Sequence, residues 1–207
     1  MDYKTEQENF WANSEWGKDY IQRNGRELIK NNISFFNTII EKCSNVNSII
    51  EFGANIGLNL HALNTLFNNI DLNAIEINNQ AVSELKKLDF LNEVYHESIL
   101  EFKPTKKWDL VLIKTVLIHI NPEYLDTVYE KLYQSSNKYI LIAEYYNPSP
   151  VTINYRGHEN RLFKRDFAGE MLAKYDDLEL VDYKFIYHGD NNFPQDDITW
   201  FLLRKKC

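Results

Sequence analysis

Short apolar runs alternate with segments of helical periodicity through the middle of the chain. The apolar runs predict strands over residues 46–52, 72–77, 94–98, 108–113 and 139–144. Between them, apolar residues recur at helical spacing, which predicts helices over residues 58–67, 80–88 and 121–134. This alternation is typical of a parallel sheet with helices on its faces.

Both ends of the chain depart from this pattern. Residues 5–43 are expected to be mostly helical, with apolar positions that pack on the sheet. Residues 145–162 contain Pro148, Pro150 and Gly157 and are interpreted as a long loop over the carboxyl ends of the strands. The remaining predicted elements are a helix over 163–175 and an antiparallel pair of edge strands over 178–187 and 199–205.

Composition fits an ordinary globular protein. The chain has 207 residues, of which 44% are hydrophobic and 26% charged, enough for one domain with a full core. Within it we expect a helical cap over residues 1–45, packed on a binding domain over residues 46–207. The formal net charge of −7 argues against broad electrostatic binding to nucleic acid.

Other functional classes are disfavoured by what the sequence lacks. No stretch approaches the ~20 apolar residues needed to span a bilayer, and the polar N-terminus does not resemble a signal peptide. Cys43 and Cys207 are interpreted as free thiols of a reducing compartment. The five histidines are scattered, so no metal site is expected. We therefore expect a cytoplasmic protein; the oligomeric state stays open.

The most informative segment covers residues 49–57, where an apolar run ends at Glu51 and a G-x-x-x-G pattern follows. Gly53 and Gly57 allow a turn that passes close to a ligand. Glu76 closes the next predicted strand, where a carboxylate can accept hydrogen bonds from both hydroxyls of a ribose. The pattern indicates a nucleotide-like cofactor, although glycines at this spacing can also serve only to form a tight turn.

The identity of that cofactor depends on two residues. A dinucleotide site needs G-x-G-x-x-G, but Asn55 occupies the middle position and no third glycine follows. Glu51 would repel a pyrophosphate, whereas it suits the amino group or sulfonium of S-adenosylmethionine. The sequence therefore favours S-adenosylmethionine over NAD.

The segment from Glu51 to Ile120 resembles a class I S-adenosylmethionine-dependent methyltransferase. The resemblance implies a Rossmann-like α/β fold with helices on both faces of a seven-stranded, mostly parallel sheet of order 3-2-1-4-5-7-6, in which strand 7 is antiparallel. It places Glu51, Gly53, Asn55, Gly57, Glu76 and the adjacent Ile77 around the cofactor. It also implies that Ser98 and Ile99 hold the adenine, and that the segment from Lys114 to Ile120 runs beneath the methyl group.

A closer similarity is to the pseudaminic acid biosynthesis-associated methylases. The similar segments are residues 10–11, 16–24, 51–59, 117–123, 143–148, 155–158 and 192–200. This resemblance implies an acidic nine-carbon (nonulosonic) sugar, or its nucleotide-activated form, as the acceptor of a methyl group on oxygen or nitrogen. Two alternatives stay open. The acceptor can be another small anionic metabolite, or the chain can be a non-catalytic regulatory protein that binds S-adenosylmethionine.

Acceptor chemistry points to His119. A hydroxyl acceptor needs a general base within hydrogen-bond reach, and an imidazole has a suitable ordinary pKa. The alternative is a structural histidine packed between Ile118 and Ile120. Further candidates for substrate binding are the aromatic and basic residues after the fifth strand, whose rings suit sugars and whose cations suit acids. They are Tyr145, Tyr146, Tyr155, Arg156, His158, Arg161, Lys164 and Arg165.

The N-terminal segment supplies the last candidates. Trp11, Tyr20 and Arg23 precede the fold, and Tyr20 and Arg23 share a helix face. We expect this segment to close over the cofactor, with Arg23 on the methionine carboxylate; an aromatic contact with the sheet is the simpler alternative. Asp190, Asp196 and Asp197 form an acidic cluster that is interpreted as a hinge or cap.

Overall fold

The computed structural model describes residues 3–13, 27–155 and 157–206. Tyr20, Arg23 and Arg156, which the sequence singled out, lie outside the described residues. The helices are α1 (Glu6–Asn13), α3 (Glu27–Ile40), α4 (Leu58–Leu66), α5 (Asn79–Leu85), α6 (Leu125–Ser135) and α7 (Phe167–Lys174), with two 3-10 turns, η1 (Leu117–His119) and η2 (Pro122–Tyr124). The strands are β1 (Ser48–Phe52), β2 (Asp71–Glu76), β3 (Leu91–His96), β4 (Trp108–Lys114), β5 (Ser136–Glu144), β6 (Val151–Tyr155), β7 (His158–Lys164), β8 (Leu178–Ile186) and β9 (Ile198–Lys205).

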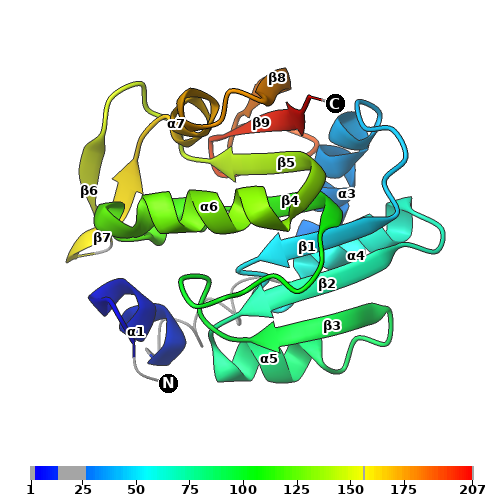
Figure 1. The fold of residues 1–207 in the computed structure, drawn as a ribbon, viewed down its shortest axis with the longest axis horizontal. Helices are drawn as coiled ribbons and strands as arrows, with labels where there is room; N and C mark the ends of the chain where they lie inside the picture. The colour runs from blue at the N-terminus through cyan, green and yellow to red at the C-terminus, as the bar shows by residue number, and fades with distance from the viewer. Residues whose placement is uncertain (1–2, 14–26, 156, 207) are drawn as a thin grey trace.

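Seven strands form the central sheet, in the order β3-β2-β1-β4-β5-β9-β8 (Figure 1). Strands β1 to β5 pair in parallel, whereas β9 is antiparallel to both β5 and β8. Counted within this sheet alone, β8 is the sixth strand and β9 the seventh, which is the expected order. The labels differ because the separate two-stranded sheet of β6 and β7 stands between β5 and β8 in the chain.

Side-chain alternation divides the core between the two faces of the sheet. In β1, Ile49 packs with the cluster under α3 and α4, and Ile50 with the cluster under α6 and α7. Both side chains are fully buried, as expected for a strand covered on both faces. The predicted strands and helices between residues 46 and 144 are confirmed, with boundaries shifted by a few residues.

The segment after β5 differs from the expectation. Residues 145–162 were interpreted as a loop, but β6 and β7 form an antiparallel hairpin that extends from the carboxyl edge of the sheet (Figure 1). Its turn depends on Gly157, whose φ of 87° favours glycine and whose N–H donates to Asn154 Oδ1 at 2.9 Å. The helix predicted over 163–175 is correspondingly shorter, since Phe163 and Lys164 belong to β7 and α7 begins at Phe167.

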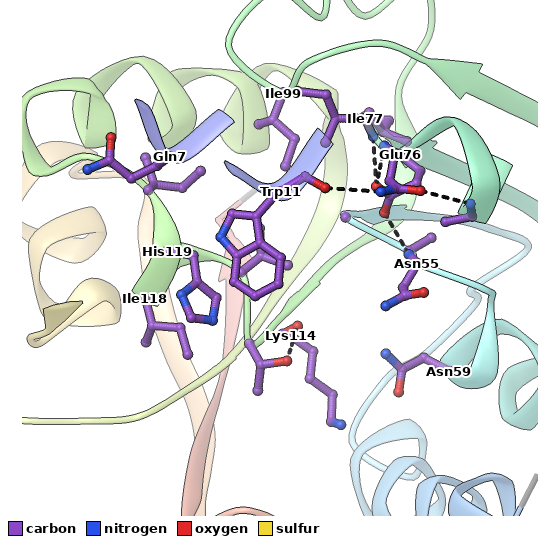
Figure 2. A pocket seen from close by; sticks show the side chains of 18 of the residues that line it. Gln7, Trp11, Asn55, Asn59, Glu76, Ile77, Ile99, Lys114, Ile118 and His119 are labelled. Carbon is purple, nitrogen blue, oxygen red and sulfur yellow. Dashed lines mark hydrogen bonds between the residues drawn. The ribbon is translucent and has the colours of Figure 1, made fainter. Parts of the chain in front are cut away.

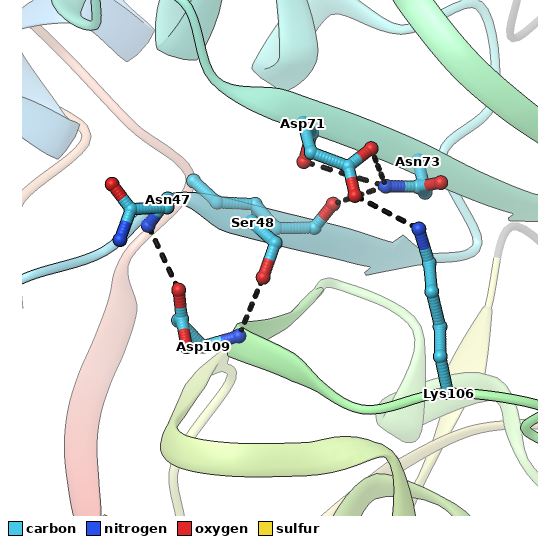
Figure 3. Close-up of polar contacts among 7 residues, drawn as sticks. Asn47, Ser48, Asp71, Asn73, Lys106 and Asp109 are labelled. Atoms are coloured by element: carbon cyan, nitrogen blue, oxygen red, sulfur yellow. Dashed lines mark hydrogen bonds and ion pairs between the residues drawn. The ribbon is translucent and has the colours of Figure 1, made fainter.

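Polar contacts tie the strands together at the amino end of the sheet (Figure 3). Asn47 N donates to Asp109 Oδ2 at 2.9 Å, and Asp109 N donates to Ser48 Oγ at 3.0 Å, which joins β1 to β4. Lys106 Nζ pairs with Asp71 Oδ2 at 2.8 Å, which anchors the start of β2. These contacts lie at the end of the sheet opposite the carboxyl ends of the parallel strands.

Candidate functional site

A cavity of about 390 Å³ opens at the carboxyl ends of β1, β2 and β4 (Figure 2). Its walls come from α1, the turn after β1, the segments after β2, β3 and β4, and the loop before β9. The structure brings together these sequence-predicted site residues in the cavity wall: Trp11, Gly53, Asn55, Glu76, Ile77, Ser98, Ile99, Lys114, His119, Tyr145 and Tyr155.

The turn after β1 needs its glycines. Gly53 has a φ of 76°, and a Cβ there would lie 2.6 Å from Cγ2 of Val116. Gly57 has a φ of 82°, and a Cβ there would lie 2.9 Å from Cδ1 of Leu88. Both positions therefore exclude a larger side chain by backbone conformation and by contact. Gly57 itself is not part of the cavity wall.

Glu76 is buried at the end of β2 and organises this turn. Its Oε2 accepts from Asn55 N at 2.7 Å, and its Oε1 accepts from Ile77 N at 2.9 Å and Asn78 N at 2.8 Å. Burial raises the pKa of Glu76, while these three backbone hydrogen bonds act to lower it. A carboxylate has about four acceptor positions, so three bonds leave one available toward the cavity.

Glu51 lies outside the cavity wall. Its side chain is 1% exposed, and its Oε1 accepts a hydrogen bond from Asn59 Nδ2 at 2.6 Å. Burial raises its pKa to about 8, with Asn59 and the nearby charge of Lys114 opposing the rise. At neutral pH most of the Glu51 carboxyl is therefore protonated, a different state from the cation-binding carboxylate that the sequence suggested.

His119 sits on η1, directly after β4. Its Nδ1 is 2.6 Å from Arg161 O. A carbonyl oxygen can only accept, so Nδ1 carries the proton in this contact and the lone pair of the neutral ring is on Nε2. Burial lowers the pKa of His119 to about 4, although the hydrogen bond to Arg161 O acts in the opposite direction. The imidazole is thus held neutral, in one tautomer.

Aromatic rings surround His119. The Trp11 ring centroid lies 4.4 Å from that of His119, and the Tyr155 centroid lies 5.2 Å from it. The three rings come from α1, η1 and β6, which are far apart in the sequence. Figure 2 shows Trp11 between His119 and the Glu76–Asn55 side of the cavity.

Helix α1 is held over the cavity by residues that the sequence analysis missed. Glu8 Oε2 accepts from the backbone of Lys4 and Thr5 in a capping box, and its Oε1 accepts from Ser98 Oγ. Asn78 Nδ2 donates to Trp11 O at 3.1 Å. The pattern Thr5-x-x-Glu8 is a helix-start signal in the sequence, but nothing local shows where that helix docks.

Most of the basic residues after β5 do not line the cavity. Arg161 pairs with Glu6 at 3.2 Å, and Arg165 pairs with Glu170 at 2.6 Å on the side of α7. Lys164 Nζ lies 5.1 Å from the centre of the Tyr145 ring. His158 and Tyr146 also lie outside the cavity wall, the latter 42% exposed. Among the described members of this group, Tyr145 and Tyr155 therefore line the cavity and the others do not.

The loop before β9 contributes a wall that the sequence did not predict. Pro194, Gln195 and Asp196 line the cavity. In the same loop, Asp190 Oδ1 accepts from two backbone N–H groups, and Asp197 Oδ2 pairs with His188 Nδ1 at 2.7 Å. The cap role expected of the acidic cluster fits Asp190 and Asp197, whereas Asp196 belongs to the site.

Two further features bear on the class of site. Within the described ranges, no three His, Cys, Asp or Glu side chains converge as metal ligands would. In that same part of the chain, none of the helices has the length and apolar character to cross a bilayer.

Comparison with known proteins identifies the fold. No family model and no curated protein sequence matches the chain. Among solved structures, it is similar to the plantazolicin methyltransferase BpumL in complex with SAH, with a TM-score of 0.66 and 15% identity over 97% of this chain and 94% of that chain. It is also similar to magnesium protoporphyrin IX methyltransferase (ChlM) from Synechocystis PCC 6803 with bound SAM, with a TM-score of 0.65 and 10% identity over 100% of both chains.

A third similar structure is the glycopeptide N-methyltransferase MtfA with S-adenosylmethionine, with a TM-score of 0.63 and 12% identity over 83% of this chain and 86% of that chain. At such low identity these likenesses establish the architecture alone. The chain has the Rossmann-like α/β fold of S-adenosylmethionine-dependent methyltransferases, with a mostly parallel sheet.

Proposed function

We propose that the protein is an S-adenosylmethionine-dependent methyltransferase that acts on a small molecule. The observation that carries this proposal is one continuous cavity in which the glycine turn after β1 and Glu76 face a neutral histidine. In an open α/β sheet, ligands bind outside the carboxyl ends of the strands, where this cavity lies.

The residues present fit the cofactor. Glu76 retains an acceptor position for a ribose hydroxyl, and the cradle at Gly53 has no room for a Cβ. Ile77 and Ile99 supply apolar walls for a base, next to Ser98. When bound, S-adenosylmethionine supplies an electrophilic methyl group on its sulfonium.

The chain's own residues would then prepare the acceptor. Nε2 of His119 can accept the proton of an acceptor hydroxyl or ammonium, because Nδ1 is already committed to Arg161 O. Trp11 and Tyr155 exclude water around the imidazole and offer flat surfaces to a ring. In this proposal His119 is the general base.

For the acceptor, we infer a small acidic molecule of the nonulosonic type, free or nucleotide-activated. The resemblance to pseudaminic acid biosynthesis-associated methylases supports it, as do aromatic walls that suit a sugar ring. Because Arg161 and Arg165 pair with carboxylates outside the cavity, they support it less than the sequence suggested. Methylation of another small metabolite and donor binding without turnover are the alternatives.

The first experiment is calorimetric titration of the protein with S-adenosylhomocysteine and with NAD. Binding of S-adenosylhomocysteine without binding of NAD is the expected result. Mass spectrometry of candidate sugars and sugar nucleotides, incubated with enzyme and donor, should then show the mass gain of one methyl substitution. A protein that binds NAD and ignores S-adenosylhomocysteine contradicts the proposal.

The role of His119 has its own test. His119→Asn should lower turnover by roughly 10²–10⁴-fold, the usual contribution of general-base catalysis, and leave the affinity for S-adenosylhomocysteine unchanged. His61→Asn, on α4 outside the cavity, is the matched control and should retain full activity. Full activity of the His119 variant would make the residue structural.

A further inference from the structure

Polar side chains gather at one end of the cavity, away from Ser98 and Ile99. In Figure 2, Ile99 and Glu76 lie toward one side, and Lys114 and Asn59 lie together on the other. The cavity-lining members of this polar group come from α3, α4, β4 and the loop before β9: Asn32, Asn59, Lys114, Gln195 and Asp196. A ligand with its base at Ile99 and its ribose at Glu76 would extend toward this group.

Lys114 places a positive charge in this wall, on a half-buried side chain. Its Nζ lies 5.5 Å from the centre of the Phe35 ring, and no carboxylate in the described part of the chain reaches ion-pair distance. Burial lowers the pKa of Lys114, while Glu51, Asp196 and Glu144 act to raise it. Since burial raises the pKa of both Glu51 and Glu144 to about 8, these two carboxyls are mostly uncharged at neutral pH. A partly desolvated cation with no carboxylate at ion-pair distance favours an anionic ligand.

Asp196 places a negative charge at the rim of the same wall. It is exposed to solvent, and its charge acts on Lys114. Neighbouring contacts fix the loop against α3, because Asn31 Nδ2 donates to Pro194 O at 3.0 Å and Gln195 Nε2 donates to Asn32 Oδ1 at 3.2 Å. The cavity therefore presents a positive charge inside and a negative charge at the edge, the latter on a loop that is fixed against α3.

This arrangement is complementary to an α-amino acid, which carries a carboxylate and an ammonium on one carbon. We propose that Lys114 binds the carboxylate and Asp196 the ammonium of the methionyl end of the methyl donor. The inference rests on the proposed function, since it assumes that S-adenosylmethionine occupies the cavity. It gives Asp196 the role that the sequence suggested for Glu51, and Lys114 the role that it suggested for Arg23.

Glu51 is a poor candidate for the ammonium. Its carboxyl lies outside the cavity wall, and its Oε1 already accepts from Asn59 Nδ2. We assign Glu51 the role of holding Asn59 in place, because Asn59 lines the cavity. Asn32, 4% exposed, also lines the cavity and links the loop to α3.

The test compares two ligands that differ only in the amino-acid part. S-adenosylhomocysteine carries it, and 5′-methylthioadenosine lacks it. Calorimetry on Lys114→Met should show the affinity for S-adenosylhomocysteine reduced roughly tenfold or more, the effect of losing a hydrogen bond to a charged group, with 5′-methylthioadenosine unchanged. Asp196→Asn should change the two affinities in the same pattern, and Lys114→Arg should recover most of the loss.

The controls are Lys86→Met, on the exposed end of α5, and Asp190→Asn, in the same loop as Asp196 but outside the cavity wall. Both should bind the two ligands as the unmodified protein does. Unchanged S-adenosylhomocysteine affinity in Lys114→Met and Asp196→Asn would overturn the inference, as would an equal loss for both ligands. If the unmodified protein binds neither ligand, the proposed function itself fails.

Discussion

At the scale of single residues, the site depends on buried groups whose ionisation is set by their surroundings. Glu51 is the clearest case, because burial raises its pKa from an ordinary 4.5 to about 8. A raised folded-state pKa contributes stability that is fully present below pH 4.5 and is lost as the pH rises through 8. Glu51 therefore makes the folded state less stable in alkaline solution.

Glu51→Gln removes this titration and keeps an acceptor for Asn59. Urea unfolding at pH 6 and pH 9 should show that the variant loses less stability than the unmodified protein, by roughly 1–3 kcal/mol. Burial also raises the pKa of Glu144 to about 8, so the free energy of unfolding should still fall somewhat between the two pH values in both proteins. Glu84→Gln, at an exposed position, is the control and should behave as the unmodified protein does. An equal loss of unfolding free energy between pH 6 and pH 9 in Glu51→Gln and the unmodified protein would mean that Glu51 is ionised when folded.

At the scale of elements, Asn78 links two helices through one amide. Its Oδ1 caps α5 by accepting from Gln80 N and Ala81 N, and its Nδ2 donates to Trp11 O and Ala12 O at the end of α1. The first pair stabilises α5 locally. The second fixes α1 over the cavity. One side chain therefore both caps α5 and holds the helix that forms part of the cavity wall.

Asn78→Asp separates these two roles. The carboxylate keeps the cap, but it loses the donor and faces two carbonyl oxygens. We expect little change in the free energy of unfolding and faster hydrogen exchange in residues 6–13, with weaker binding of S-adenosylhomocysteine. Asn78→Ala should also lose about 1 kcal/mol of stability with the cap. If exchange in α1 is unchanged in Asn78→Asp, other contacts hold that helix.

At the scale of the whole molecule, the core and the site are built from different segments. The two buried clusters on the faces of the sheet include no described residue of α1. The cavity, in contrast, is lined by residues from many segments of the chain, the first of them Thr5 and the last Ile198. Folding of the sheet and completion of the site are therefore separable.

Deletion of residues 1–13 tests this separation. The truncated chain should unfold cooperatively, with far-ultraviolet circular dichroism close to that of the full chain apart from one short helix. Its affinity for S-adenosylhomocysteine should fall at least roughly tenfold, because the wall formed by Glu8 and Trp11 is gone. Retained affinity in the folded truncation would show that α1 does not contribute to the binding site.

The fold was predictable where the signal is local. The apolar runs of β1 to β5, the glycine turn and the acid at Glu76 were all identified from adjacent residues. The hairpin was missed because Pro148, Pro150 and Gly157 outweighed the alternation of residues 151–155. Trp11 was expected beside the cofactor and does line the cavity. The position of Asp196 could not be inferred, since it depends on which distant surface the loop before β9 packs against.

The contact between His119 and the main-chain oxygen of residue 161 has a consequence for evolution and engineering. Every amino acid carries that oxygen, so substitution of the side chain at residue 161 leaves the hydrogen-bond acceptor in place and the imidazole keeps its orientation. The exposed side chains of the hairpin can accordingly vary without loss of the tautomer that leaves the lone pair on Nε2 of His119.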